Sequence, residues 1–391
     1  MTPKNPYRIA LIHPSAGVNW SGGSEILAIE LTRHLSKYFE VELLSQAAGE
    51  NFSYPIKCIP RTHSYRAVRH PLLAPFLRKF TTPEIVLEHL TSFFPSLFRL
   101  LTKPADLIFP HNDYGGLAMA ACARFLTKTP ILFLEHNGLL GRGDDGSLLQ
   151  NGKCLNRNLK FSPDHLILFD EATAEFVHTQ KPAQTTSVIP NGVNLEQFTP
   201  DGKQIDLDLP KPIILCVASL NCQNQKRVEL AIQAVSRLKE ASLLVCGDGP
   251  DRPYFQAMGE QLLGTKRFAI RSFTFEQMPA VYRSANALTL PSIHEPFGLV
   301  YLEAMASGLP VVATDDEMRR YIVGDGGILC DVTDIDAYAE ALKDALSGDW
   351  SICARESAAR FSWDAIAMRY RDVILQTIHE SKKFKRSRTQ R

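Results

Sequence analysis

The stretch "HEPFGLVYLEAMASGLPVVATD", residues 294–315, carries two carboxylates that a simple helix between two strands does not need. Pro296 and Gly298 predict a turn, and an apolar helix and an apolar strand follow it. Glu295 lies in the turn, whereas Glu303 lies inside the helix. Carboxylates are good acceptors for sugar hydroxyls and can accept both hydroxyls of a ribose diol. The stretch therefore predicts a sugar or sugar-nucleotide site.

The start of this predicted helix adds a site for an anion. Free backbone N–H groups and the positive end of the helix dipole lie there, and both favour a phosphate. Eight residues separate Glu295 from Glu303, which corresponds to about 80° around a helix, so the two carboxylates could face one ligand. The alternative is that Glu295 caps the helix and Glu303 lies on the surface. The apolar neighbours of Glu303 favour the ligand role.

Strand-like apolar runs alternate with amphipathic helical patterns on both sides of this stretch, which predicts parallel sheets covered by helices on both faces. The first series of strands covers 8–14, 41–45, 107–110, 131–135, 166–169 and 187–190, and the second covers 213–219, 243–247, 268–273, 287–292, 309–314 and 327–330.

A segment rich in Pro, Gly and charge, 198–212, divides the two series. We therefore predict an α/β protein with two Rossmann-like domains that face a cleft, because ligands of such sheets bind at the carboxyl ends of the strands. The expected parts are an N-terminal domain over 1–200, a C-terminal domain over 201–361, and a last segment over 362–391. This segment would contain a helix and a basic, disordered tail.

The composition excludes several classes of protein. A chain of 391 residues suffices for two domains of roughly 150–200 residues. With 45% hydrophobic residues, 22% charged residues and a net charge of +1, it shows no sign of disorder or nucleic-acid binding. Its eight cysteines form no C-x-x-C pair. The N-terminus does not resemble a signal peptide and no long apolar run occurs, so we expect a cytoplasmic location.

Shorter motifs add candidate residues. In "WSGGSE" (20–25), Gly22 and Gly23 would let the backbone approach a ligand, although a plain turn is equally compatible. His136 in "LEHNG" follows a buried strand, where ligands of such sheets bind, and His111 is the second choice. No G-x-G-x-x-G occurs, which disfavours a nicotinamide or flavin enzyme.

Lys226 in "NQKR" (224–227) lies at the start of a predicted helix, where a cation has no favourable interaction with the helix dipole. This position favours a role in binding an anion. Two D-x-D motifs, 206–208 and 334–336, are assigned to a linker and to a helix N-cap, so we expect no metal site.

Taken with their order along the chain, these motifs resemble a known family. The pattern E-P-F-G-L-x-x-x-E-A-M-A-x-G-x-P-V-V resembles the signature of family 4 glycosyltransferases, retaining enzymes of the GT-B fold. "WSGGSE", "PNGVNLEQFTP", "QKRVELAIQAV" and "GDGP" follow in the family's order.

The resemblance implies a role for each motif. Glu295 and His136 would contact the transferred sugar, Glu303 would bind the donor ribose, and Lys226 would neutralise the leaving diphosphate. Further donor-binding residues would be Gly22, Gly23, Ser219, Gly249, Arg271, Phe297, Gly298 and Leu299. Two positions depart from the family pattern: Ser219 replaces a customary phosphate-binding arginine, and Arg271 stands where glycine is usual near the base.

The implied function is metal-independent transfer of a sugar, with retention, from a UDP- or GDP-linked donor to a hydroxyl acceptor (a glycan, a lipid-linked molecule or a small molecule). No further cofactor is expected. Two alternatives stay open: a GT-B sugar-nucleotide epimerase and a non-catalytic protein that binds nucleotide sugars. Acceptor contacts are expected mainly within 46–105. Arg, Lys, Phe and Leu mix over 65–80 and 90–101, which suits either a peripheral membrane contact or ordinary helix packing. A long helix over 361–378 is expected to cross back to the first domain, as in GT-B proteins.

Overall fold

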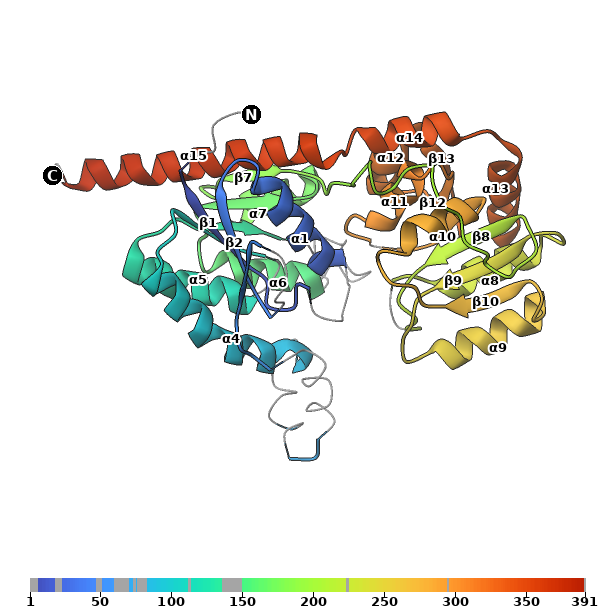
Figure 1. Cartoon of the computed structure of the whole chain (residues 1–391), viewed down its shortest axis with the longest axis horizontal. Coiled ribbons are helices and arrows are strands. Elements are labelled where there is room, and N and C mark those ends of the chain that lie inside the picture. The colour runs from blue at the N-terminus through green and yellow to red at the C-terminus, as the bar shows by residue number, and fades with distance from the viewer. Residues whose placement is uncertain are drawn as a thin grey trace. The chain divides into compact units, whose positions relative to one another are not determined.

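The computed structural model divides the chain into two compact units, each built on parallel sheets (Figure 1). Unit 1 combines Met1–Pro190 with Ile366–Arg391, and unit 2 is Asn191–Ala365. The structure describes residues 6–17, 23–46, 51–59, 70–72, 75, 83–111, 114–135, 150–222, 225–293 and 295–389.

Unit 1 holds a four-stranded sheet in the order β3-β2-β1-β4 and a three-stranded sheet in the order β5-β6-β7. Parallel bridges from Ile108 to Ile131 and from His111 to Leu134 join β4 to β5, so the two sheets continue one another. The strands are β1 (Arg8–Ile12), β2 (Glu40–Ser45), β3 (Ser53–Pro55), β4 (Leu107–Pro110), β5 (Leu132–Leu134), β6 (His165–Leu168) and β7 (Thr186–Val188). The helices are α1 (Gly23–Leu35), α4 (Pro83–Thr102), α5 (Tyr114–Thr127), α6 (Gln150–Leu159), α7 (Glu171–Gln180) and α15 (Trp363–Thr389).

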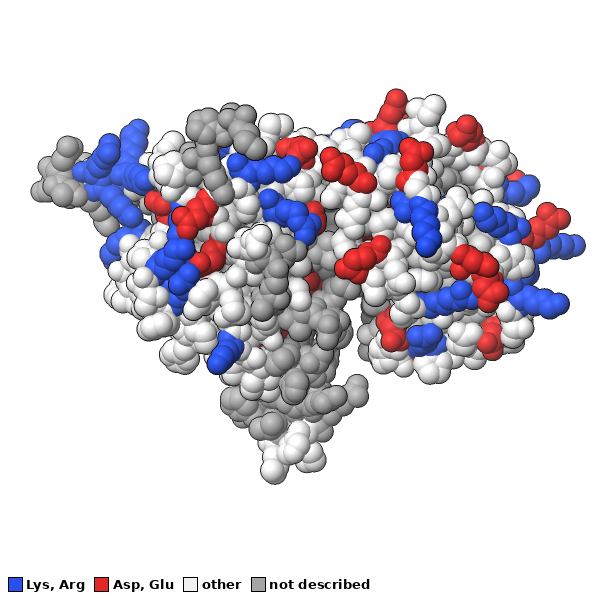
Figure 2. All heavy atoms as spheres, in the orientation of Figure 1, with Lys and Arg blue, Asp and Glu red and all other residues white. Residues whose placement is uncertain are grey.

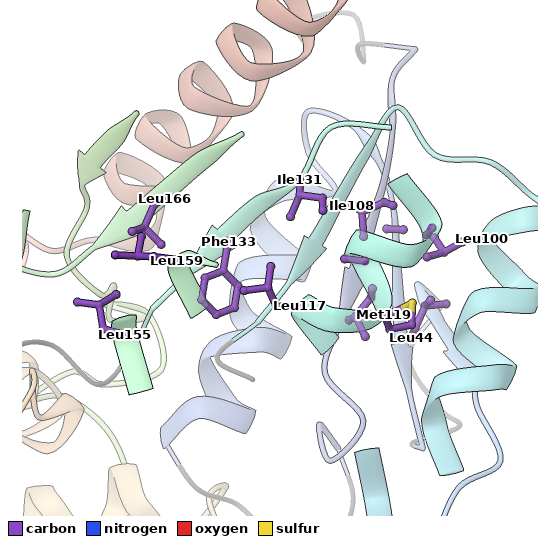
Figure 3. Close-up of a cluster of buried hydrophobic side chains, with 14 of the residues drawn as sticks. Leu44, Leu100, Ile108, Leu117, Met119, Ile131, Phe133, Leu155, Leu159 and Leu166 are labelled. Carbon is purple, nitrogen blue, oxygen red and sulfur yellow. The ribbon is translucent and has the colours of Figure 1, made fainter. Parts of the chain in front are cut away.

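The core of unit 1 lies between these strands and helices (Figure 3). Strands buried on both faces read as continuous apolar runs, and β1 and β4 are buried along their whole length. The cluster drawn in Figure 3 includes Leu44, Leu100, Ile108, Leu117, Met119, Ile131, Phe133, Leu155, Leu159 and Leu166.

Unit 2 holds one six-stranded parallel sheet in the order β10-β9-β8-β11-β12-β13. The chain moves outward from β8 in one direction and then returns to β11 on its other side. This reversal is the topological switch point, where open α/β sheets bind their ligands. The strands are β8 (Ile213–Val217), β9 (Ser242–Cys246), β10 (Phe268–Arg271), β11 (Ala287–Leu290), β12 (Val311–Thr314) and β13 (Gly327–Cys330). The helices are α8 (Val228–Ser236), α9 (Arg252–Leu263), α10 (Met278–Ser284), α11 (Leu299–Ala306), α12 (Glu317–Val323), α13 (Ile335–Ser347) and α14 (Ser351–Ala359), with a short 3₁₀ helix, η1 (Gly324–Gly326).

The last helix differs from the expected one. Helix α15 runs to Thr389, so the basic tail that we expected to be disordered is helical up to that residue. Its middle is held in unit 1, because the ring of Tyr370 lies 6.1 Å from that of Phe109 and Arg369 donates to the carbonyl of Val188 at 2.6 Å. None of the helices in the described ranges combines the length and the apolar character needed to cross a bilayer.

Candidate functional site

The turn before α11 has the geometry that its sequence predicts. Gly298 adopts a left-handed backbone with φ of +86°, and a Cβ there would lie 2.5 Å from the ring of Tyr301. Gly298, the N-cap residue of α11, has no side chain with which to cap the helix, which leaves the first N–H groups of α11 without a cap from that residue and suited to bind a ligand. The Tyr301 hydroxyl is within hydrogen-bonding distance of the Ser292 hydroxyl at 2.9 Å and of the Leu290 carbonyl at 3.1 Å, which fixes the ring beneath the turn.

Lys226 and Glu295 form an ion pair beside this turn. Lys226 lies in the loop after β8 and Glu295 in the loop after β11, and these strands are neighbours at the switch point. The N–H of Ile293 donates to the carbonyl of Gln225 at 2.8 Å, so the two loops are also joined through the backbone. Both charged side chains are largely buried, with 19% and 11% of their surfaces exposed. The structure thus brings together two residues that the sequence had separated by 69 positions.

Two arginines support the loop after β11. Arg319, at the start of α12, is buried and donates to the carbonyl of Glu295 at 2.6 Å and to the Asp316 carboxylate at 2.9 Å. Arg227 donates to the carbonyl of Pro291 at 2.8 Å. Arg319 was not among the residues that the sequence motifs indicated. The available signal was weak, because Asp316 three residues before Arg319 is also an ordinary N-cap.

Glu303 is buried inside α11 and hydrogen-bonded. The hydroxyl of Tyr282, from α10, donates to a Glu303 carboxylate oxygen at 2.7 Å. Burial disfavours the charged form and raises the pKa of Glu303 to about 7, although the Tyr282 hydrogen bond opposes that rise. The carboxyl group therefore holds its proton more firmly than an exposed glutamate does. The structure excludes the surface position that was the alternative for this residue.

The loops after β8 and β9 pack closely against each other. The N–H of Leu220 donates to the carbonyl of Asp248 at 3.0 Å, and a Cβ on Gly249 would overlap the backbone of Leu220. Ser219 is exposed at the carboxyl end of β8. Arg271, at the end of β10, pairs with Asp208 at 3.3 Å, and both side chains remain solvent-accessible.

The remaining predicted residues belong to unit 1 or lie outside the described part of the chain. Gly23 begins α1 and is exposed, whereas Gly22 and His136 lie outside the described residues. His111 directly follows β4 and is buried, and its ring lies 5.4 Å from that of His13, which directly follows β1.

The D-x-D motifs take part in local backbone structure. Asp206 accepts a hydrogen bond from the N–H of Asp208 at 2.7 Å. Asp334 caps α13, as expected, by accepting from two backbone N–H groups. Within the described residues no group of three or more His, Cys, Asp or Glu side chains is arranged to hold a metal ion.

Comparison with known proteins assigns both halves of the chain to glycosyltransferases. The family described as "Glycosyltransferase Family 4" matches residues 21–197, and the one described as "Glycosyl transferases group 1" matches residues 198–366. The D-inositol 3-phosphate glycosyltransferase of Streptomyces avermitilis is 26% identical over 98% of this chain and 90% of its own. That of Corynebacterium urealyticum is 31% identical, but the match covers 46% of this chain and 49% of the relative.

Solved structures show the same fold. A sucrose-phosphate synthase from Thermosynechococcus elongatus superimposes with a TM-score of 0.75 at 20% identity, over 96% of this chain and 100% of its own. The Anabaena protein HepE, in complex with UDP and glucose, superimposes with a TM-score of 0.66 at 17% identity, over 95% and 100% of the two chains. The chain therefore belongs to the family 4, group 1 type of glycosyltransferases, enzymes of the GT-B fold that transfer a sugar from a nucleotide-sugar donor.

Proposed function

We propose that this glycosyltransferase moves its sugar to a hydroxyl acceptor with retention at the anomeric carbon, and that Lys226, Glu295 and the start of α11 carry the chemistry. The observation that carries the proposal is the largely buried Lys226–Glu295 ion pair beside the uncapped α11. The inositol phosphate glycosyltransferases among the relatives support a hydroxyl acceptor.

In this proposal Lys226 changes its partner when the donor binds. In the free enzyme the Lys226 ammonium pairs with Glu295. A bound diphosphate would draw the ammonium away, and Glu295 would then accept hydrogen bonds from hydroxyls of the transferred sugar. Glu303 would bind the donor ribose, and the backbone of Phe297, Gly298 and Leu299 would contact the sugar and the diphosphate. His136 would act on the reacting face of the sugar.

The proposed reaction proceeds on one face of the sugar. The bond between the anomeric carbon and the diphosphate oxygen breaks, and its electron pair stays on that oxygen. The acceptor oxygen then bonds to the anomeric carbon on the same face, and its proton passes to the departing diphosphate. Negative charge grows on the diphosphate, where Lys226 and the α11 N–H groups stabilise it. These groups replace a metal ion, so we propose a metal-independent reaction whose only co-substrate besides the acceptor is the donor.

The donor is proposed to be linked to UDP or GDP, and the UDP bound by HepE supports the former. We place the enzyme in the cytoplasm, in peripheral contact with the inner face of the membrane, and include lipid-linked molecules among the candidate acceptors. The acceptor would bind mainly in unit 1.

A panel of UDP- and GDP-linked sugars, with polyol, glycan and lipid-linked acceptors, tests this function. We expect release of nucleoside diphosphate that depends on the acceptor, and nuclear magnetic resonance of the product should show the anomeric configuration of the donor. The rate should be unchanged in excess chelator. An epimerised donor without acceptor transfer, or binding without turnover, would contradict the proposal, and an inverted product would exclude retention.

A further inference from the structure

The outer face of α4 is apolar. Leu90, Phe94, Phe98 and Leu101 are all exposed, and their spacing of four, four and three residues places them along one side of the helix. Phe94 and Phe98 expose 74% and 67% of their surfaces. A helix on the surface of a soluble unit normally carries polar residues on its outer side.

The inner side of α4 is also largely apolar, because Leu100 belongs to the core of unit 1 and Phe93 and Leu97 pack against that core. The inner side therefore already anchors the helix. The outer aromatic residues add nothing to that packing, and leaving them in water is unfavourable. This arrangement is typical of a helix that has a second apolar environment to contact.

The exposed apolar residues continue onto α5, which packs alongside α4. Phe125 and Leu126, in the last turn of α5, expose 76% and 57% of their surfaces. The Thr129 hydroxyl donates to the carbonyl of Ala105 at 3.2 Å, so the segments that follow the two helices are joined. We call the six side chains the apolar face: Leu90, Phe94, Phe98, Leu101, Phe125 and Leu126.

Cations border the end of the apolar face. Lys103 follows α4, and the ammonium of Lys128 lies 5.1 Å from the ring centre of Phe125. The ammonium of Lys382 lies 3.8 Å from the Asp106 carboxylate, so the basic end of α15 also reaches this region. That end carries the exposed side chains Lys382, Lys383, Phe384, Lys385 and Arg386.

Acidic residues are scarce on the same helices. After Leu87 the only carboxylate of α4 is the buried Glu88, and α5 has none. In Figure 2 the surface over α5 and the adjacent part of α4 is mostly white, and Lys and Arg side chains gather at the C-terminal end of α15. Carboxylates lie beside the cations, because Lys103 pairs with Glu40 at 3.1 Å and with Glu42 at 3.5 Å. The excess of positive charge in this region therefore comes from Lys128 and from the end of α15.

We infer that the apolar face and its basic border form a docking surface for a bilayer that contains anionic lipids. Large apolar side chains can enter the boundary between headgroups and acyl chains, and lysines and arginines are attracted to anionic headgroups. Stable attachment usually needs two such signals together, and unit 1 presents both. This inference specifies the surface for the membrane contact proposed above, and it does not depend on the chemistry of unit 2.

A second copy of the chain fits this surface less well. A two-fold dimer would set the same patch of both copies against each other. The basic border of one copy would then lie near that of the other, and like charges across an interface disfavour association. An anionic bilayer instead matches both the apolar residues and the cations.

Vesicle sedimentation with the full-length protein tests the inference. We expect binding to vesicles of equal parts phosphatidylcholine and phosphatidylglycerol, and much weaker binding to phosphatidylcholine alone. The double variant Phe94→Ser/Phe98→Ser should lose roughly tenfold or more in vesicle affinity, because each buried aromatic ring contributes more than the free energy of one tenfold change. Tyr254→Ser/Ile352→Ser, at two exposed apolar positions of unit 2, is the matched control and should bind like the wild type.

The basic border needs its own variant. Lys383→Glu/Lys385→Glu should weaken binding to the anionic vesicles and leave the binding to phosphatidylcholine unchanged. Added salt should weaken the wild type in the same way, because the attraction to headgroups is screened. Circular dichroism and the melting temperature should match the wild type, and so should calorimetric binding of the nucleoside diphosphate, which is proposed to contact residues of unit 2; together they would show that the variants are folded.

Three results would overturn the inference. The first is a wild-type protein that does not bind the anionic vesicles, and the second is a Phe94→Ser/Phe98→Ser variant that binds them as tightly as the wild type. The third is a wild-type dimer that this variant dissociates, which would assign the face to a second copy. None of these results changes the transferase activity measured with the donor panel, so this failure and that of the proposed function can be told apart.

Discussion

Replacing Lys226 by methionine removes the ammonium and keeps most of the side-chain volume. If Lys226 faces the diphosphate when the bond breaks, its loss should slow kcat more than it raises the KM for the donor. A unit charge at about 4 Å from the developing charge is worth about 4 kcal/mol at an effective dielectric constant near 20. That dielectric suits a lysine whose side chain is only 19% exposed. The expected loss in kcat is therefore roughly 10²–10³, the usual cost of removing one preorganised group of this kind.

The ion pair also predicts that replacing Glu295 strengthens the binding of the diphosphate, whereas replacing Lys226 weakens catalysis. Glu295→Gln removes the partner that holds Lys226 in the free enzyme. The diphosphate would then no longer compete with Glu295 for the lysine, so we expect it to bind more tightly, roughly two- to fivefold if the lost pair is worth up to about 1 kcal/mol. The same variant should have a lower kcat, because the sugar loses a hydrogen-bond acceptor. The double variant should lose less than the sum of the two single losses, as expected for residues that interact directly.

Steady-state kinetics and calorimetric titration with the nucleoside diphosphate measure these quantities. If Lys226→Met keeps more than about a third of the wild-type kcat and kcat/KM, a change of less than roughly 0.7 kcal/mol, Lys226 does not stabilise the departing diphosphate. Unchanged diphosphate affinity in Glu295→Gln would exclude the exchange of partners. Phosphate binding would then have to be assigned to other groups, including the N–H groups of α11.

Four further outcomes are expected. Because the pKa of Glu303 is raised to about 7, the KM for the donor should fall as the pH rises through 7 and the carboxylate ionises, and Glu303→Gln should remove this dependence. The raised pKa also makes the stability depend on pH: protonated Glu303 contributes at most about 3 kcal/mol to the free energy of unfolding below the unfolded pKa of 4.5, and this contribution is lost as the pH rises through 7. The melting temperature of Glu303→Gln should therefore rise relative to that of the wild type as the pH increases. Gly249→Ala should lower the affinity for the donor and the melting temperature together, because its Cβ would overlap the backbone of Leu220, and normal values for both would show that the loop adapts. Arg319→Ala should lower kcat roughly tenfold with little change in fold, because Glu295 loses the contact that holds its carbonyl, and Arg319→Lys should restore part of the rate.

The sequence predicted the second unit well because its signals are local. The turn at Gly298, the helix that follows and the apolar strands each depend on residues close together in the chain, and the structure has all of them. The alternation of strands and helices also predicted parallel sheets in both units. The proximity of Lys226 and Glu295 could be expected only from the order of the strands, because each residue belongs to a different loop.

Other features depend on tertiary contacts, and the sequence did not reveal them. Arg319 supports the carbonyl of Glu295 across 24 positions, and Tyr282 bonds Glu303 from another helix. The short strand β3 was missed because Ser53–Pro55 carries no apolar run. Phe94 and Phe98 belong to a segment assigned either to a membrane contact or to helix packing, since the sequence cannot say which side of an apolar helix faces outward. Roles for His136 and for Ser219 stay predictions.

The path of the chain between the units has a consequence for biosynthesis. Unit 2 is a continuous segment, whereas unit 1 is assembled from the two ends of the chain. Unit 2 can therefore fold as soon as it leaves the ribosome, but unit 1 must wait until residues 366–391 have been translated. Until then the surface that receives Tyr370, Ile374 and Ile378, all of them buried in the finished protein, stays open to water or to a chaperone. Premature termination shortly after unit 2 would thus leave a folded unit 2 attached to an incomplete unit 1, a product expected to be cleared by proteolysis.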